Sequence, residues 1–304
     1  MPLAWPNLPA SVLVELMIML RYPRHRTVVI RLLVALAVVA ALAVCGCGSS
    51  GGKVSRPSTQ PAGVPEASAP PDGGARFKFI VCGDPQNNYE VFNRVLEAAR
   101  SVDFLIIAGD LTGSGTATEF QAFVNAMRSS GVKYYTIPGN HDVATSPVGG
   151  NYITYLGAPH RSFDHKNAHF VLIDNSAREL GFYPGEREWV RRDLKAAGKK
   201  GFDHVIAVAH VPPGYPYSSK ATAAQIPGID ANAELVPVLS AGGVRELFCA
   251  HLHTYIADRD GGVNVTITGG AGAPLHTLVG GEALHHYVLV EVNGKQLTRT
   301  MIRI

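Results

Sequence analysis

From residue 77 onward, continuous apolar runs alternate with stretches in which apolar residues recur at helical spacing. The apolar runs are Phe77–Cys82, Phe104–Ala108, Tyr134–Pro138, His204–Ala209 and Glu246–Ala250. The helical spacing between them predicts helices over Tyr89–Arg100, Thr118–Ser129, Gly185–Ala197 and Ala231–Leu239. Strands that are apolar throughout are typical of a sheet buried on both faces. Alternating strands and helices therefore predict an α/β fold.

The C-terminal part of the chain has a different pattern. Val263–Thr268, His286–Val292 and Gln296–Ile304 read as consecutive strands joined by glycine-rich turns such as Asn293-Gly294. The chain is thus expected to end in a strand-rich region rather than in a further strand–helix unit.

The N-terminal pattern predicts a targeting signal rather than a folded domain. A basic stretch, Arg21–Arg31, precedes an unbroken apolar run, Leu32–Val44, and then Cys45-Gly46-Cys47. This order is typical of a secretory signal, and the run is shorter than the roughly 20 residues of a membrane span. Its end resembles a bacterial lipobox. Cys47 is the preferred lipidation site because the small Gly46 precedes it; Cys45 is the alternative, and an uncleaved signal anchor is another.

The chain is therefore divided into three parts. Residues 1–47 are expected to be a signal peptide with a lipobox, and residues 48–75, rich in Gly, Ser, Pro and Ala, a disordered linker. Residues 76–304 are expected to form one domain. This predicts an exported lipoprotein, held at the membrane of the cell envelope by an acyl anchor.

Charge and cysteine content exclude few classes of function. The formal charge of +3 is contributed by residues 1–47, and the rest of the chain has equal numbers of basic and acidic residues. A neutral domain in which no basic run stands out disfavours nucleic acid as a partner. Cys82 and Cys249 are read as small buried residues, with a disulfide between them as the alternative.

Metal-capable side chains follow five of the predicted strands. These residues are Asp84 and Gln86, then Asp110, then Asn140, His141 and Asp142, then His210, and finally His251 and His253. Ligands of α/β proteins bind outside the carboxyl ends of the strands, so these groups are expected to converge. Carboxylates and imidazoles suit a pair of Mn, Fe or Zn ions, and such a pair can hydrolyse a phosphoester.

The five blocks GDPQ, GDLT, GNHD, a lone strand-end His and AHLH resemble those of the calcineurin-like metallophosphoesterases. The resemblance implies a four-layer sandwich of two mixed β-sheets flanked by helices. It also implies two metal sites that share Asp110. The first would use Asp84, Gln86, Asp110 and His253, and the second would use Asp110, Asn140, His210 and His251.

The resemblance gives His141 and Asp142 catalytic rather than ligand roles. His141 would contact the phosphoryl group and protonate the leaving oxygen, and Asp142 would orient the His141 ring. The sequence departs from the family pattern at Gln86, where His is usual, and at Ala250, where Gly is usual. A neutral amide is a weaker ligand than imidazole, so the first site is expected to bind metal more loosely.

These features predict hydrolysis of a phosphomonoester or phosphodiester by a hydroxide that bridges two metal ions. The first alternative is a metal-binding scaffold that presents loops to a partner and hydrolyses little. The second alternative is a nuclease. The histidines outside the blocks are read as surface or core residues; for His276, which follows the glycine-rich stretch after the last block, a position near the site is the alternative.

Overall fold

We describe a computed structural model of the chain, which covers residues 74–145, 150–177, 181–213, 232–278 and 280–304. The predicted signal peptide and lipobox, with Cys45 and Cys47, lie outside the described residues, as does all of the predicted linker except Gly74 and Ala75. Within the part of the chain that is described, the helices are too short or too polar to cross a bilayer.

The first sheet has five strands and contains both ends of the described domain. Its order is β11-β10-β1-β2-β3. Its strands are β1 (Arg76–Cys82), β2 (Phe104–Ile107), β3 (Tyr134–Thr136), β10 (His286–Asn293) and β11 (Gln296–Arg303). β1, β2 and β3 are parallel, whereas β10 pairs antiparallel with both β1 and β11. The sheet is therefore mixed.

The second sheet has six strands in the order β4-β5-β6-β7-β9-β8. Its strands are β4 (Arg161–His165), β5 (Ala168–Ile173), β6 (His204–Ala209), β7 (Glu246–Cys249), β8 (Tyr255–Asp260) and β9 (Val263–Thr268). The four central strands are parallel and the two edge strands are antiparallel. This sheet is also mixed, as expected.

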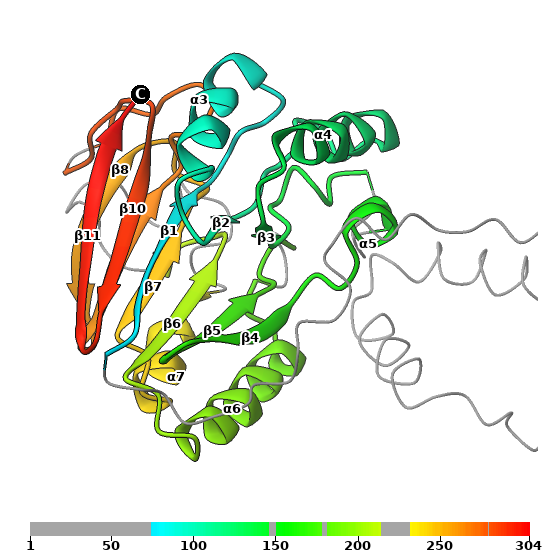
Figure 1. Ribbon diagram of the computed structural model, residues 1–304. Helices are drawn as coiled ribbons and strands as arrows, with labels where there is room; N and C mark the ends of the chain where they lie inside the picture. The colour runs from blue at the N-terminus through cyan, green and yellow to red at the C-terminus, as the bar shows by residue number, and fades with distance from the viewer. Residues whose placement is uncertain (1–73, 146–149, 178–180, 214–231, 279) are drawn as a thin grey trace, which may run out of the picture. The chain divides into compact units, whose positions relative to one another are not determined.

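Helices cover the outer faces of the two sheets (Figure 1). The helices are α3 (Tyr89–Ala99), α4 (Ala117–Ser130), α5 (Gly150–Leu156), α6 (Pro184–Gly198) and α7 (Leu235–Ala241). Apolar residues of α3 and α4 pack on the first sheet, and those of α6 and α7 pack on the second. Helix, sheet, sheet and helix give the four layers that the sequence predicted.

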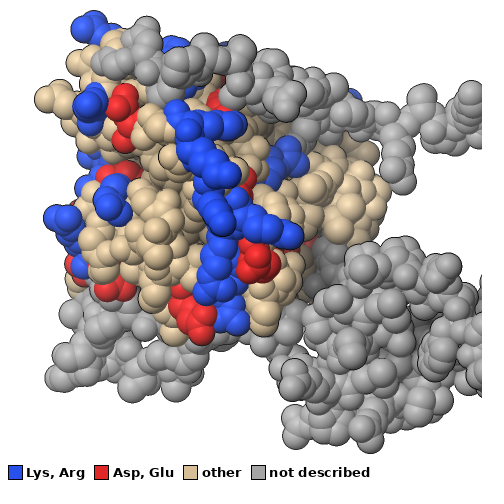
Figure 2. Space-filling model, turned by 90° about the horizontal axis from the view of Figure 1, so that it is seen from below, with Lys and Arg blue, Asp and Glu red and all other residues tan. Residues whose placement is uncertain are grey.

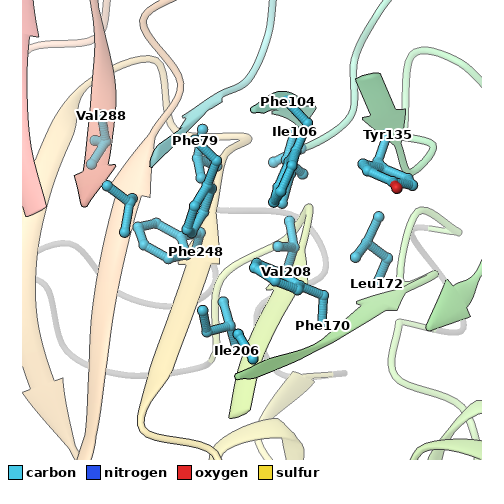
Figure 3. Packing of buried hydrophobic residues seen from close by; sticks show 14 of the residues in the cluster. Phe79, Phe104, Ile106, Tyr135, Phe170, Leu172, Ile206, Val208, Phe248 and Val288 are labelled. Atoms are coloured by element: carbon cyan, nitrogen blue, oxygen red, sulfur yellow. The ribbon is translucent and has the colours of Figure 1, made fainter. Parts of the chain in front are cut away.

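The strands are apolar throughout because each of their faces meets a different layer. In β1, Phe79 and Val81 point into the core between the sheets, whereas Ile80 and Cys82 point toward α3 and α4. Figure 3 shows the inter-sheet core, where the Phe79 ring meets Phe104, Phe170 and Phe248 from both sheets. Two-sided burial thus explains the continuous hydrophobic runs.

The structure adds to and corrects the predicted order of elements. It contains α5, β4, β5 and β8, none of which the sequence pattern predicted. The last three predicted strands are not neighbours, because β9 belongs to the second sheet while β10 and β11 form a hairpin in the first. Cys82 and Cys249 are free and buried, on the outer faces of different sheets, so the alternative of a disulfide is wrong.

Candidate metal centre

The polar residues that follow the strands lie at one edge, where the carboxyl ends of both sheets meet. Asp84 follows β1, Asp110 follows β2 and His253 follows β7. These three residues each offer a ligand atom, and the ligand atoms all lie within 4.8 Å of one another. All three side chains are buried, so the parallel strands gather metal-capable groups in a site that water reaches poorly.

The two carboxylates are held by the backbone of the opposite blocks. The amide of His251 donates to Oδ2 of Asp84 at 2.9 Å, and the amide of His141 donates to Oδ1 of Asp110 at 2.8 Å. Oδ1 of Asp84 is buried with no hydrogen-bond partner among the described residues. A buried carboxylate oxygen without a donor is costly, and a cation would satisfy it.

The pKa values of the two carboxyls diverge. Burial raises the pKa of Asp84 well above its ordinary value, and the nearby charge of Asp110 raises it further. Burial would also raise the pKa of Asp110, but the interactions of its carboxylate with the His210 and His141 imidazoles and with the amide of His141 outweigh burial, so this pKa lies below its ordinary value. Two adjacent buried carboxyls cannot both ionise cheaply unless a cation lies between them.

Three histidines face the site with Nε2, because Nδ1 of each ring faces a backbone carbonyl. Nδ1 lies 2.8 Å from the carbonyl oxygen of Ala108 in His210, 2.7 Å from that of Pro274 in His253 and 2.6 Å from that of Gly113 in His141. A carbonyl oxygen only accepts, so each Nδ1 carries the proton. In the neutral ring the lone pair is then on Nε2, the arrangement that a metal ligand or proton carrier needs.

The lone pairs converge on Asp110. Nε2 of His210 lies 3.4 Å from Oδ1 of Asp110 and 3.1 Å from Oδ1 of Asn140. With the His210 proton on Nδ1, these three atoms are all acceptors that face one another. Either a second proton on the ring or a cation between them must offset their repulsion.

Gln86, from the first block, also contacts the Asp110 carboxylate. Its Nε2 donates to Oδ2 of Asp110 at 3.1 Å and lies 3.4 Å from Nε2 of His253. As placed, the amide nitrogen rather than the oxygen faces the site. Ligation by Gln86 therefore requires the amide to turn by half a rotation, which exchanges its oxygen and nitrogen.

The backbone is strained where these residues converge. Among the described residues, six other than glycine have positive φ, and four of them are Asp84, Gln86, Asp110 and His251. Such conformations cost about 1 to 3 kcal/mol each and concentrate at functional sites. Gly139 permits the close approach, because a Cβ there would lie 2.1 Å from Oδ1 of Asp110. Ala250, where the family usually has Gly, is absent from the positive-φ residues, so its backbone tolerates the added methyl group.

Asp142 differs from its expected role. Its buried carboxylate accepts from the amides of Leu111, Thr112 and Gly139 and from the Thr112 hydroxyl. Burial, with the charge of Asp110, raises the pKa of Asp142 to about 7. The His141 ring is oriented by the Gly113 carbonyl instead. Asp142 thus positions the backbone of the second and third blocks rather than the ring itself.

The sequence did not identify Asn175, which holds the block of His210. Asn175 follows β5 and is buried; its Oδ1 accepts from the amides of His210 and Val211 at 2.9 and 3.1 Å. Its Nδ2 donates to the carbonyl of Val211 and to Oδ1 of Asn232, both at 2.7 Å. The sequence contains a pattern that could have identified Asn175, because the apolar run before it ends in polar residues like the runs that precede the other blocks.

His276 lies beside the site, which was the alternative interpretation of its position after the glycine-rich stretch. Its ring stacks on that of His253 with centroids 4.2 Å apart, and its amide donates to the His253 carbonyl at 2.8 Å. Burial lowers the pKa of His253 to about 4, and the charge of His276 contributes. His253 is therefore a neutral imidazole over the physiological pH range.

The fold and the site define a class: a two-sheet α/β protein with a buried group of carboxylates and imidazoles that could hold metal ions at the carboxyl edge. The comparisons with known proteins assign this class to a family. Residues 77–255 match the Calcineurin-like phosphoesterase family, and the chain belongs to it.

The chain is also similar to individual members. It is 28% identical over 127 residues to a 3′,5′-cyclic-nucleotide phosphodiesterase of Nostoc sp., and the match covers 40% of this chain and 46% of that protein. Among solved structures, a purple acid phosphatase from yellow lupin superposes with a TM-score of 0.62 at 14% identity, covering 76% of this chain and 52% of the phosphatase. GAP50 of Plasmodium superposes with a TM-score of 0.52 at 14% identity, covering 75% of this chain and 84% of that one. These structural similarities support the fold alone.

Proposed function

We propose that the protein hydrolyses a phosphoester with two metal ions at this edge. One observation carries the proposal: the ligand atoms of Asp84 and His253 lie within 4.8 Å of that of Asp110, and Nε2 of His210 lies 3.4 Å from Oδ1 of Asp110. A single carboxylate between two groups of ligands is the arrangement that a dinuclear centre requires.

The ligand sets follow from the positions around Asp110. Asp84, Gln86 and His253 would complete one site, and Asn140, His210 and His251 the other. When bound, two Mn, Fe or Zn ions would supply an activated water and compensate the charge that develops on the phosphoryl oxygens. Nδ1 of His210 donates to the backbone carbonyl of Ala108, and Nδ1 of His253 donates to that of Pro274. These hydrogen bonds hold both rings in the tautomer whose Nε2 lone pair would bind metal.

His141 would act on the leaving group. Its ring lies next to the shared carboxylate, with Nε2 3.9 Å from Oδ2 of Asp110, and its side chain is 36% exposed whereas that of Asp110 is 1% exposed. Because Nδ1 is anchored on the Gly113 carbonyl, Nε2 is the nitrogen that can meet substrate. A proton carried there would pass to the departing alcohol oxygen.

The substrate class extends to phosphomonoesters and phosphodiesters. The cyanobacterial relative is named as a cyclic-nucleotide phosphodiesterase, which favours a diester as the first substrate to test. The match covers less than half of that protein, so the diester is a starting point for assays.

Metal content and turnover, measured on the same sample, test this proposal. The chain is purified without chelator, Mn, Fe and Zn are quantified by elemental analysis, and a chromogenic phosphomonoester is assayed beside a chromogenic phosphodiester. The proposal requires about two metals per chain and turnover that a chelator abolishes and metal restores. A chain that binds no metal would refute it.

A metal-binding scaffold is the second candidate, and two observations favour it. The amide of Gln86 stands where the family usually has a stronger imidazole ligand, and GAP50 is described as an anchor in the inner membrane complex of Plasmodium. Two bound metals without turnover on either ester would support this candidate. The partly exposed His141 favours hydrolysis, because a structural metal site does not need a histidine at this position.

We also infer an envelope location from the N-terminal sequence. The proposed anchor is an acyl-modified Cys47, with Cys45 as the alternative, and the proposed spacer is the Gly/Ser/Pro/Ala-rich segment 48–75. Mass spectrometry of the mature N-terminal peptide tests this. An acylated cysteine at the new N-terminus is expected, and an unprocessed N-terminus would instead support the signal anchor.

A further inference from the structure

Helix α6 carries a strongly basic face that the metal centre does not use. Residues 187–200 include six basic residues and two acidic ones. The basic residues are Arg187, Arg191, Arg192, Lys195, Lys199 and Lys200. Arg191, Arg192, Lys195 and Lys199 are exposed, and none of the four forms an ion pair with another described residue. The expectation that no basic run stands out in the domain was therefore wrong.

Among the described residues, acids pair only with the two ends of this stretch, Glu234 with Arg187 and Asp164 with Lys200. Asp193 accepts from the Ser162 hydroxyl and lies 2.8 Å from Nε2 of the buried His169, so it turns inward. Glu186 is buried against His160. Glu188 is the one acidic residue of α6 that stays exposed beside the four free basic residues.

The basic residues lie on one side because the helix buries the other. Val190, Leu194 and Ala197 pack on the second sheet. Arg191, Lys195 and Lys199 are four residues apart, so they form one row on the solvent side. Like charges at this spacing repel one another and destabilise a helix, and an anionic partner would remove that repulsion.

Figure 2 shows the molecule from below, the side on which α6 lies in Figure 1. A nearly continuous row of Lys and Arg side chains crosses this face, with few Asp and Glu side chains beside it. A helix rises 1.5 Å per residue, so the exposed row from Arg191 to Lys199 extends over about 12 Å.

We propose that this basic face of α6 rests on anionic lipid headgroups. The proposal rests on the envelope anchor inferred above. A flexible spacer of the length predicted for residues 48–75 would keep the domain within roughly 30 Å of the bilayer. At that range a basic face meets anionic lipid at high effective concentration, and each Lys or Arg adds about a fivefold preference for an anionic over a neutral surface.

The position of α6 favours lipid over nucleic acid. The chain leaves β5, returns along α6 and enters the parallel strand β6, so α6 runs along the outer face of the second sheet. The metal centre lies at the carboxyl edge of the strands. A nucleic acid bound along the outer face would extend past the site rather than into it, whereas a membrane on this face leaves the carboxyl edge open to the side.

Lysine labelling of the full-length chain in vesicles tests the proposal. The chain is reconstituted in pure phosphatidylcholine vesicles and in vesicles with a large share of phosphatidylglycerol, and a limiting dose of acetic anhydride is applied. We expect Lys195 and Lys199 to be acetylated about tenfold more slowly on the anionic vesicles. Lys133 is exposed directly before β3 of the first sheet, and it should be acetylated at the same rate on both vesicle types. Concentrated salt should remove the difference.

Two matched variants make the result specific. Arg191→Glu with Arg192→Glu reverses charge on α6, and Arg94→Glu with Arg128→Glu makes the same change on exposed positions of α3 and α4. Only the α6 variant should lose the protection of Lys195 and Lys199. Both should keep the metal content of the parent chain, which separates this test from that of the proposed hydrolysis.

Other results would overturn the proposal. Equal acetylation on the two vesicle types, or an equal loss of protection in both variants, would contradict it. Protection by duplex DNA but not by anionic vesicles would assign the face to nucleic acid. Failure of the chain to stay with neutral vesicles would refute the anchor, while the comparison on anionic vesicles would still decide the role of α6.

Discussion

Two regions of this molecule hold buried histidines in opposite ways. At the metal centre, Nδ1 of His210 and of His253 donates to a backbone carbonyl. Behind the second sheet, His169 of β5 lies between two carboxylates: Nδ1 is 2.6 Å from Asp164, and Nε2 is 2.8 Å from Asp193. We call this second arrangement the carboxylate clamp.

The partner decides which protonation state each region favours. Burial lowers the pKa of His253 to about 4, so its Nε2 lone pair is available at neutral pH. Burial also disfavours charge on His169, but the hydrogen bonds that its ring donates to Asp193 and Asp164 outweigh burial and raise the pKa of His169. The same side chain is therefore a neutral imidazole with an available Nε2 lone pair in one region, whereas in the other its protonated form is favoured.

The largest expected effect comes from removing the charge that the two metal sites share. Asp110→Asn keeps the shape of the side chain but should release most of the metal, because both ligand sets lose their common carboxylate. Turnover should fall about a thousandfold or more. Elemental analysis and steady-state kinetics measure the two losses. Retention of both metals would refute the shared role of Asp110.

His141→Ala should separate catalysis from metal binding. Its ring is held by the Gly113 carbonyl, outside the proposed ligand sets, so the metal content should stay at the level of the parent chain. Turnover should fall about 10² to 10⁴-fold, the range for loss of a general acid. If this variant lost metal as completely as Asp110→Asn, the assignment of His141 would be wrong.

Breaking the carboxylate clamp should affect stability and leave the metal centre intact. His169→Ala leaves Asp164 and Asp193 without their shared partner and should lower the free energy of unfolding by about 3 kcal/mol. Urea denaturation measures the change. Metal content per folded molecule should equal that of the parent chain, and a loss of metal as large as the loss of stability would show that the two regions are coupled.

Asn175→Ala should weaken the second metal site without removing a ligand. Asn175 holds the backbone of His210 and Val211, so the His210 ring should lose its fixed position. Metal affinity should fall about tenfold to a hundredfold, as for other residues that orient ligands. Competition with a chromophoric chelator measures this affinity. Asn175→Asp, which keeps the accepting oxygen, should recover part of it.

The smallest expected effect is a pH dependence of the free energy of unfolding, which arises from the carboxylate clamp. The folded chain holds the His169 proton more tightly than the unfolded chain, so this stabilisation is complete below the ordinary histidine pKa of about 6.5 and is lost as pH rises through the raised value. The parent chain should therefore lose stability relative to His169→Gln as pH rises above about 6.5. A constant difference over this range would show that His169 is not charged in the folded chain.

The metal edge was predictable from the sequence because its information is local. Each block is a short polar sequence at the end of an apolar run, and parallel strands bring such ends together. The pattern at Asn175 was similar, but β5 was not recognised as a strand, so its polar end was not assigned to the site. The orientation of His141 by Gly113 instead of Asp142 depends on backbone geometry that spacing does not contain.

The clamp and the basic face were not predictable because they depend on which elements become neighbours. His169 on β5 meets Asp164 on β4 and Asp193 on α6, and no short motif joins these positions. Overall neutrality concealed the charge on α6, because Glu186 and Asp193 turn inward while Arg191, Arg192 and Lys195 stay exposed. Charge summed along a chain therefore says little about charge on one surface.

Anomalous diffraction from crystals grown with Mn²⁺ tests the dinuclear centre. We expect two anomalous peaks, one on each side of the Asp110 carboxylate, with His253 next to one peak and His210 next to the other. We also expect the His141 ring nitrogens to lie beyond bonding distance of both peaks. A single peak, or peaks that do not share Asp110, would contradict the dinuclear centre on which the proposed hydrolysis depends.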